Sequence, residues 1–134
     1  MKKLIALFVT ILTINSCSND DSVNNATILE GNWLLTTIGG GDRPEDFPNT
    51  EDVTNQNIKY MFHNNKYNVT RNGEISEKGT FEVEENSFGT LQLHLTQDSS
   101  EPLIIYTIIE FSEDNNTVIF QDDGDWILTL KRIQ

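Results

Sequence analysis

The chain contains 134 residues and carries a formal net charge of −12 at pH 7, with a pI near 4.3. A nucleic-acid-binding domain needs a basic face for the phosphates, so this charge excludes nucleic acid as a partner. The same charge excludes direct adsorption to anionic lipid. A chain of this length forms one domain around a single small hydrophobic core.

The N-terminal residues have the three zones of an export signal. Lys2 and Lys3 form a positive start, and residues 4–14 are apolar apart from two threonines. This apolar stretch is shorter than the roughly 20 residues of a membrane-spanning helix, but it suits a signal peptide. The following Ile14-Asn15-Ser16-Cys17 resembles the lipobox of bacterial lipoproteins. We therefore expect residues 1–16 to be removed and Cys17 to become the lipid-modified first residue.

Cys17 is the only cysteine, so it has no intramolecular disulfide partner. The alternative is an ordinary secretory signal followed by an unmodified thiol. The lipobox resemblance implies acyl chains such as palmitate on Cys17, and two or three chains anchor a protein durably in a membrane. Asp20-Asp21 resembles the surface-export signal of Bacteroidetes-type lipoproteins, although residues 17–27 also have the composition of a flexible tether. We expect an outer-membrane protein, with surface display slightly favoured over a periplasm-facing position.

From residue 28 onward, apolar and polar residues alternate in short segments separated by turn residues, which predicts β-strands. The polar stretch 42–57 has the composition of a loop, with room for a helical turn near 51–55. Asn72-Gly73 is a strong hairpin signal. Segment 103–111 is apolar on both faces, which indicates a strand packed on both sides. The strands are expected at 29–38, 58–62, 67–71, 75–83, 91–95, 103–111, 117–120 and 126–132.

This pattern predicts an all-β domain over residues 28–134. About eight strands joined mostly by tight turns form an antiparallel up-and-down meander. Closing such a meander into a barrel removes its exposed edges, so we expect a small closed barrel. An open two-sheet sandwich is the structural alternative.

The order of residues resembles the lipocalin-like proteins, which are calycin-type barrels, over roughly residues 28–133. Leu29-Glu30-Gly31-Asn32-Trp33 matches the Gly-x-Trp pattern of the first strand in that family. Further matches lie at Phe62-x-x-Asn65-x-Tyr67, at Gly79-Thr80-Phe81 and in the closing strand 126–132. The segment 112–116 lacks the Thr-Asp-Tyr pattern of classical lipocalins, and the chain has no disulfide. The resemblance therefore supports the fold more strongly than it supports transport.

The resemblance implies one structural residue pair at the closed end of the barrel. In the family, the first-strand tryptophan plugs this end, and a basic residue of the last strand lies across it. Here these residues are Trp33 and Arg132, with Lys131 as the second choice for the basic partner. A cation–π pair of this kind contributes about 0.5–2 kcal/mol to stability.

The alternating apolar face predicts the residues that line the barrel interior. A small apolar ligand in that interior is the leading hypothesis, and the alternative is that the same side chains simply fill the core. The two buried tyrosines are the most informative of these residues, because a buried hydroxyl needs a hydrogen-bond partner that a ligand could supply. The candidate lining residues are Tyr60, Phe62, Tyr67, Phe81, Leu93, Trp126 and Leu128.

No motif in the sequence indicates catalysis or metal binding. His63 and His94 lie in different segments and lack the spacing of a zinc site, and the acidic run at 122–125 lacks the frame of an EF-hand loop. No pattern places a nucleophile beside a base. We expect neither enzymatic activity nor a cofactor. The competing hypothesis for function is a surface interaction protein with a filled barrel, whose partner is another envelope protein.

Overall fold

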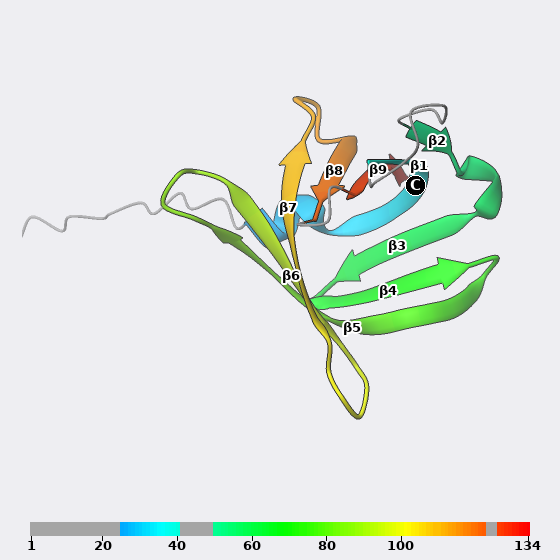
Figure 1. The fold of residues 1–134 in the computed structure, drawn as a ribbon, viewed down its shortest axis with the longest axis horizontal. Helices are drawn as coiled ribbons and strands as arrows, with labels where there is room; N and C mark the ends of the chain where they lie inside the picture. The colour runs from blue at the N-terminus through cyan, green and yellow to red at the C-terminus, as the bar shows by residue number, and fades with distance from the viewer. Residues whose placement is uncertain (1–24, 41–49, 123–125) are drawn as a thin grey trace, which may run out of the picture.

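A computed structural model describes residues 25–40, 50–122 and 126–134 of the chain. The strands form one antiparallel sheet in which the consecutive strands of the barrel pair, and its first strand β1 also pairs with its last strand β9 (Figure 1). The predicted all-β fold and its closure into an eight-stranded barrel are therefore confirmed. The barrel strands are β1 (Gly31–Gly40), β3 (Ile58–His63), β4 (Lys66–Arg71), β5 (Glu74–Glu85), β6 (Leu91–Gln97), β7 (Ile104–Phe111), β8 (Thr117–Gln121) and β9 (Trp126–Ile133).

Asparagine and glycine residues shape the hairpin turns. Asn64 and Asn65 join β3 to β4 with φ values of 50° and 60°, and Asn72 and Gly73 join β4 to β5 with 52° and 87°. Positive φ at both central residues gives a turn whose twist matches that of the flanking strands. The sequence predicted the second of these turns from Asn72-Gly73.

The turn between β7 and β8 is held by a side chain instead. The Asp114 carboxylate accepts hydrogen bonds from the Ser112 hydroxyl at 2.6 Å and from the Asn116 backbone N–H at 3.0 Å. These bonds favour the charged form, with the Ser112 bond contributing most, and they lower the pKa of Asp114 to about 2.

The polar stretch between β1 and β3 is partly ordered secondary structure. The short strand β2 (Thr50–Asp52) pairs with β1, and the 3-10 helix η1 (Thr54–Gln56) follows it. Val53, between these two elements, is 1% exposed and belongs to the hydrophobic core. The helical turn predicted near 51–55 therefore lies slightly later in the chain, and this stretch is not wholly a loop.

The prediction that the first strand begins at Leu29 was wrong. Residues Asn25–Leu29 form a short helix, α1, and β1 begins at Gly31. Leu29 is fully buried, and its carbonyl accepts a 2.7 Å hydrogen bond from the Trp33 indole N–H. This packing holds one turn of helix against the barrel, and so short a turn leaves no periodic signal in the sequence.

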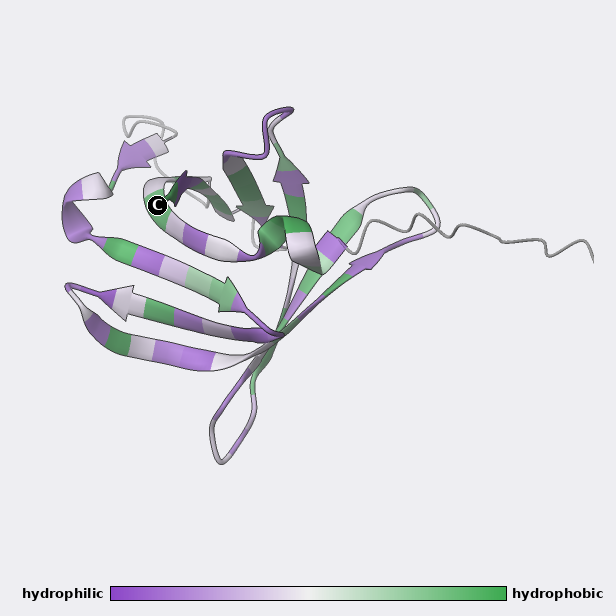
Figure 2. Cartoon of the chain, turned by 180° about the vertical axis from the view of Figure 1, so that it is seen from behind, coloured by the Kyte–Doolittle hydropathy of each residue, from purple (hydrophilic) through white to green (hydrophobic). Residues whose placement is uncertain are grey.

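The alternation of hydropathy along most of the strands is visible in Figure 2. β7 is apolar on both faces, but its burial alternates, which corrects the expectation that it is packed on both sides. Its inward-facing Ile109 is 3% exposed, whereas its outward-facing Ile104, Tyr106 and Ile108 are 50%, 55% and 41% exposed. The apolar outer residues of β7 therefore lie on the barrel surface.

A bulge in β1 changes which side chains face the interior. Pairing with β9 shifts between Leu35 and Thr37, and the Thr36 hydroxyl donates a 3.0 Å hydrogen bond to a backbone oxygen of β9. Because an extra residue reverses the alternation of side chains, the inward phase passes from Leu35 to Ile38. Ile38 consequently faces the barrel interior.

Candidate functional site

One end of the barrel is closed by Trp33 and Arg132. The Trp33 side chain is fully buried, and the guanidinium carbon of Arg132 lies 4.2 Å from its ring centroid. The guanidinium also donates 2.7 Å hydrogen bonds to the carbonyls of Glu30 and Ile28. Lys131, the second choice from the sequence, is exposed. This end is a packed plug.

A cavity of about 430 Å³ lies toward the other end of the barrel. Its wall is formed by the ends of β1, β6 and β8, by the first halves of β3, β5, β7 and β9, and by Asp122 after β8. Most of its wall is apolar or aromatic. The lining residues are Ile38, Tyr60, Glu77, Leu95, Ile105, Thr107, Phe120, Asp122, Trp126 and Leu128.

Aromatic rings form much of the cavity wall. The rings of Tyr60 and Phe120 meet edge to face, with their centroids 6.0 Å apart. Trp126 is 43% exposed, and its backbone N–H donates a 3.0 Å hydrogen bond to the Asp122 carboxylate. This bond fixes the start of β9, so one tryptophan side chain is held in the cavity wall while part of it remains in contact with solvent.

Glu77 places a carboxylate in this largely apolar wall. The Tyr67 hydroxyl donates a 2.6 Å hydrogen bond to Glu77 Oε1. Tyr67 is itself 1% exposed, and burial first and the neighbouring Glu77 second raise the pKa of its phenol. Both effects disfavour the phenolate, so Tyr67 remains a hydrogen-bond donor to Glu77 across the physiological pH range.

Two further hydroxyl groups line the cavity. Burial chiefly, and Glu77 next, raise the pKa of Tyr60, while Arg71 opposes the shift. Within the described part of the chain, the Tyr60 hydroxyl makes no hydrogen bond to protein. Thr107 is 8% exposed, and its hydroxyl makes only a long 3.4 Å bond to a backbone oxygen. The cavity therefore presents hydrogen-bonding capacity that a ligand can use.

The structure separates the seven predicted lining residues into two groups. Tyr60, Trp126 and Leu128 line the cavity. The other four predicted residues lie nearer the closed end. One of them, Tyr67, does not line the cavity but is hydrogen-bonded to Glu77, which does. Phe62, Phe81 and Leu93 do not line the cavity, because they are packed in the core with exposed fractions of 1% or less.

Sequence reasoning missed Glu77, although the signal was present. Glu77 is in phase with Gly79 and Phe81, so the alternation that points Phe81 inward also points Glu77 inward. An acidic residue at an inward position indicates a polar site in a barrel. Thr107 was missed because its strand is apolar on both faces, so the sequence did not show which of its side chains face inward.

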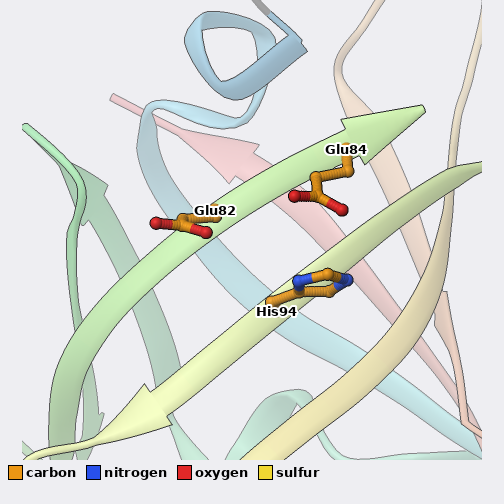
Figure 3. A group of neighbouring side chains, drawn as sticks. All are labelled: Glu82, Glu84 and His94. Carbon is orange, nitrogen blue, oxygen red and sulfur yellow. The ribbon is translucent and has the colours of Figure 1, made fainter.

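A second group of polar side chains lies on the outer face of β5 and β6 (Figure 3). One ligand atom from each of Glu82, Glu84 and His94 lies within 4.8 Å of the others. His94 also packs edge to face against Tyr106, with ring centroids 4.6 Å apart. Both glutamates are exposed, and among the described residues no fourth side chain joins the group. A structural zinc site needs four ligands, so this surface group does not meet that requirement.

The remaining sequence predictions fall on residues 1–24 and 123–125, which lie outside the described residues. These include Cys17 and most of the acidic run after β8. Among the described residues, no helix has the length and apolar character needed to span a membrane. Comparisons with protein families, curated proteins and solved structures found no match for this chain.

Proposed function

We propose that this protein is a membrane-anchored, lipocalin-like barrel that binds a small, largely apolar molecule. The observation that carries this proposal is the cavity of about 430 Å³ bounded by Tyr60, Phe120, Trp126 and Leu128. Sites for small molecules commonly have volumes of about 300–1,000 Å³ and mostly apolar walls with a few polar groups. The cavity of this barrel has both properties.

The packing of the barrel supports ligand binding over a filled interior. Large aromatic side chains, Phe62 and Phe81, meet at 5.1 Å between ring centroids toward the closed end. Toward the other end, the inward positions include shorter aliphatic side chains such as Ile105 and Leu128 beside the aromatic ones. A ligand entering this space exchanges water contact for apolar contact, which contributes about 25 cal/mol for each Å² removed from water.

A bulky substitution inside the cavity should abolish this binding. Leu128→Trp fills part of the cavity, so we expect the affinity for the apolar fluorescent probe N-phenylnaphthylamine to fall at least about tenfold. Ile108→Trp on the outer face of β7 is the matched control, and it should bind like the wild type. Fluorescence titration measures both, with circular dichroism verifying the fold. An absence of saturable binding by the wild type, or equal binding by Leu128→Trp, would contradict the proposal and favour the scaffold hypothesis.

We also propose that Cys17 carries the lipid that anchors the barrel to the outer membrane. The support is the sequence alone: the positive start, the apolar segment 4–14 and the lipobox-like residues 14–17. Several acyl chains on one residue give durable membrane binding, whereas the net charge of −12 opposes adsorption to anionic lipid. The acidic Asp20-Asp21 supports display at the cell surface.

Replacing Cys17 with serine should prevent lipid attachment. In fractionated cells, we expect the wild type in the membrane pellet, and we expect the C17S protein to be soluble or to remain as an unprocessed precursor. Ser18→Ala changes the adjacent residue and leaves the proposed lipid acceptor intact, so it should fractionate like the wild type. Retention of processed C17S protein in the membrane would show that another feature anchors the chain.

A further inference from the structure

We infer that the ligand of this cavity is an amphiphile with an amine head group, which binds Glu77 while its apolar part fills the aromatic wall. The inference rests on the proposed function and specifies the chemistry of the ligand. Glu77 is the residue that carries it, because it places a carboxylate among Leu95, Ile105 and Phe120.

The charged side chains that line the cavity, among the residues that the structure describes, are of one sign. Glu77 and Asp122 line it, and none of its lining residues is lysine, arginine or histidine. Arg71 acts on Tyr60 electrostatically, but its side chain is exposed and does not line the cavity. Within the described residues, Glu77 forms no ion pair. A cationic group in the cavity would therefore meet negative charge, and an anionic group such as a fatty-acid carboxylate would be repelled.

The hydrogen bonding of Glu77 is incomplete within the protein. A carboxylate can accept about four hydrogen bonds, and the only donor to Glu77 among the described residues is the Tyr67 hydroxyl on Oε1. An ammonium group has three N–H donors and a positive charge, so it can supply the missing bonds and neutralise the charge together. Occupation by a neutral alkyl chain alone would remove water from Glu77 without replacing those bonds, which is costly.

The aromatic wall favours the same ligand. Tyr60, Phe120 and Trp126 line the cavity together with Glu77. The face of an aromatic ring attracts a cation, most strongly for tryptophan. The Tyr60 hydroxyl can in addition accept a hydrogen bond from an ammonium group. Carboxylate, ring faces and a phenol oxygen thus form a set of groups that is complementary to an amine.

Three probes with the same alkyl chain test this inference on the full domain: decylamine, decanol and decanoate. Each is used below its micelle concentration near neutral pH to displace N-phenylnaphthylamine from the wild type. We expect decylamine to bind at least about tenfold more tightly than decanoate, with decanol between them. Glu77→Gln should weaken decylamine binding by about ten- to a hundredfold, the effect of losing one charged hydrogen bond, and should change decanol binding little.

Glu82→Gln is the matched control, because it removes the same charge from the exposed outer face of the same strand. It should leave all three affinities near those of the wild type. Equal binding of the three probes by the wild type would overturn the inference, as would equal losses in Glu77→Gln and Glu82→Gln. Either result would leave the cavity function intact, whereas failure of every probe to bind would refute the proposed function itself. The wild-type probe series decides the matter even if Glu77→Gln does not fold.

Discussion

Replacing Trp33 with alanine is expected to lower the free energy of unfolding by about 3–5 kcal/mol, the usual effect of deleting a large buried aromatic side chain. Trp33 is fully buried and packs against Phe111 with 6.2 Å between ring centroids. Its loss also leaves the Leu29 carbonyl without the indole donor and Arg132 without the ring beneath it. The plug that closes the barrel would lose its central member. Denaturant unfolding followed by circular dichroism measures the change.

The other tryptophan provides the control for this prediction. Trp126 is 43% exposed and lies in the cavity wall, so Trp126→Ala should lower the free energy of unfolding by only about 1 kcal/mol. The two variants remove the same side chain from opposite ends of one barrel. An equal or larger loss for Trp126→Ala would contradict the prediction that the Trp33 plug contributes more to stability than the cavity wall does.

The fold could be predicted because its determinants are local. Alternating apolar residues give the strand positions, and Asn72-Gly73 gives a hairpin turn through the positive φ values that both residues adopt. Closure followed from sequential hairpins, since a meander of this size otherwise leaves two edges unpaired. The helix α1 could not be predicted, because it depends on the contact between Leu29 and Trp33.

The position of the site depended on information that alternation does not contain. The two-residue alternation along a strand indicates whether a side chain faces inward. It does not indicate how far along the barrel axis that side chain lies. Phe62 and Tyr60 share one face of β3, yet only Tyr60 reaches the cavity. The bulge at Thr36 reverses the phase of β1 and brings Ile38 inward. Glu77 was missed, although its register with Phe81 made it available from the sequence.

Gly79→Ala should destabilise the protein strongly, by at least about 3 kcal/mol. A Cβ atom at Gly79 would collide with the backbone carbonyl of Thr96 on β6 and would lie 2.9 Å from the Tyr67 ring. The carbonyl belongs to the neighbouring strand, so relief requires β5 and β6 to separate, which exceeds the usual 1–3 kcal/mol of overpacking. Tyr67 would also be displaced from Glu77, and the polar wall of the cavity would be disturbed. Thermal and denaturant unfolding measure this loss.

Gly73→Ala is the comparison that separates steric crowding from backbone strain. Gly73 has a φ of +87°, but an added Cβ there meets no atom within 4 Å. Only the left-handed backbone opposes alanine at this turn, at a cost of about 1–2 kcal/mol. Judged by φ alone, Gly73 would be the position where alanine destabilises the protein more. The crowding around Gly79 predicts the opposite order. A smaller loss for Gly79→Ala than for Gly73→Ala would show that β5 and β6 can separate cheaply at this point. In that case the close approach of the two strands would not be what positions Tyr67 against Glu77.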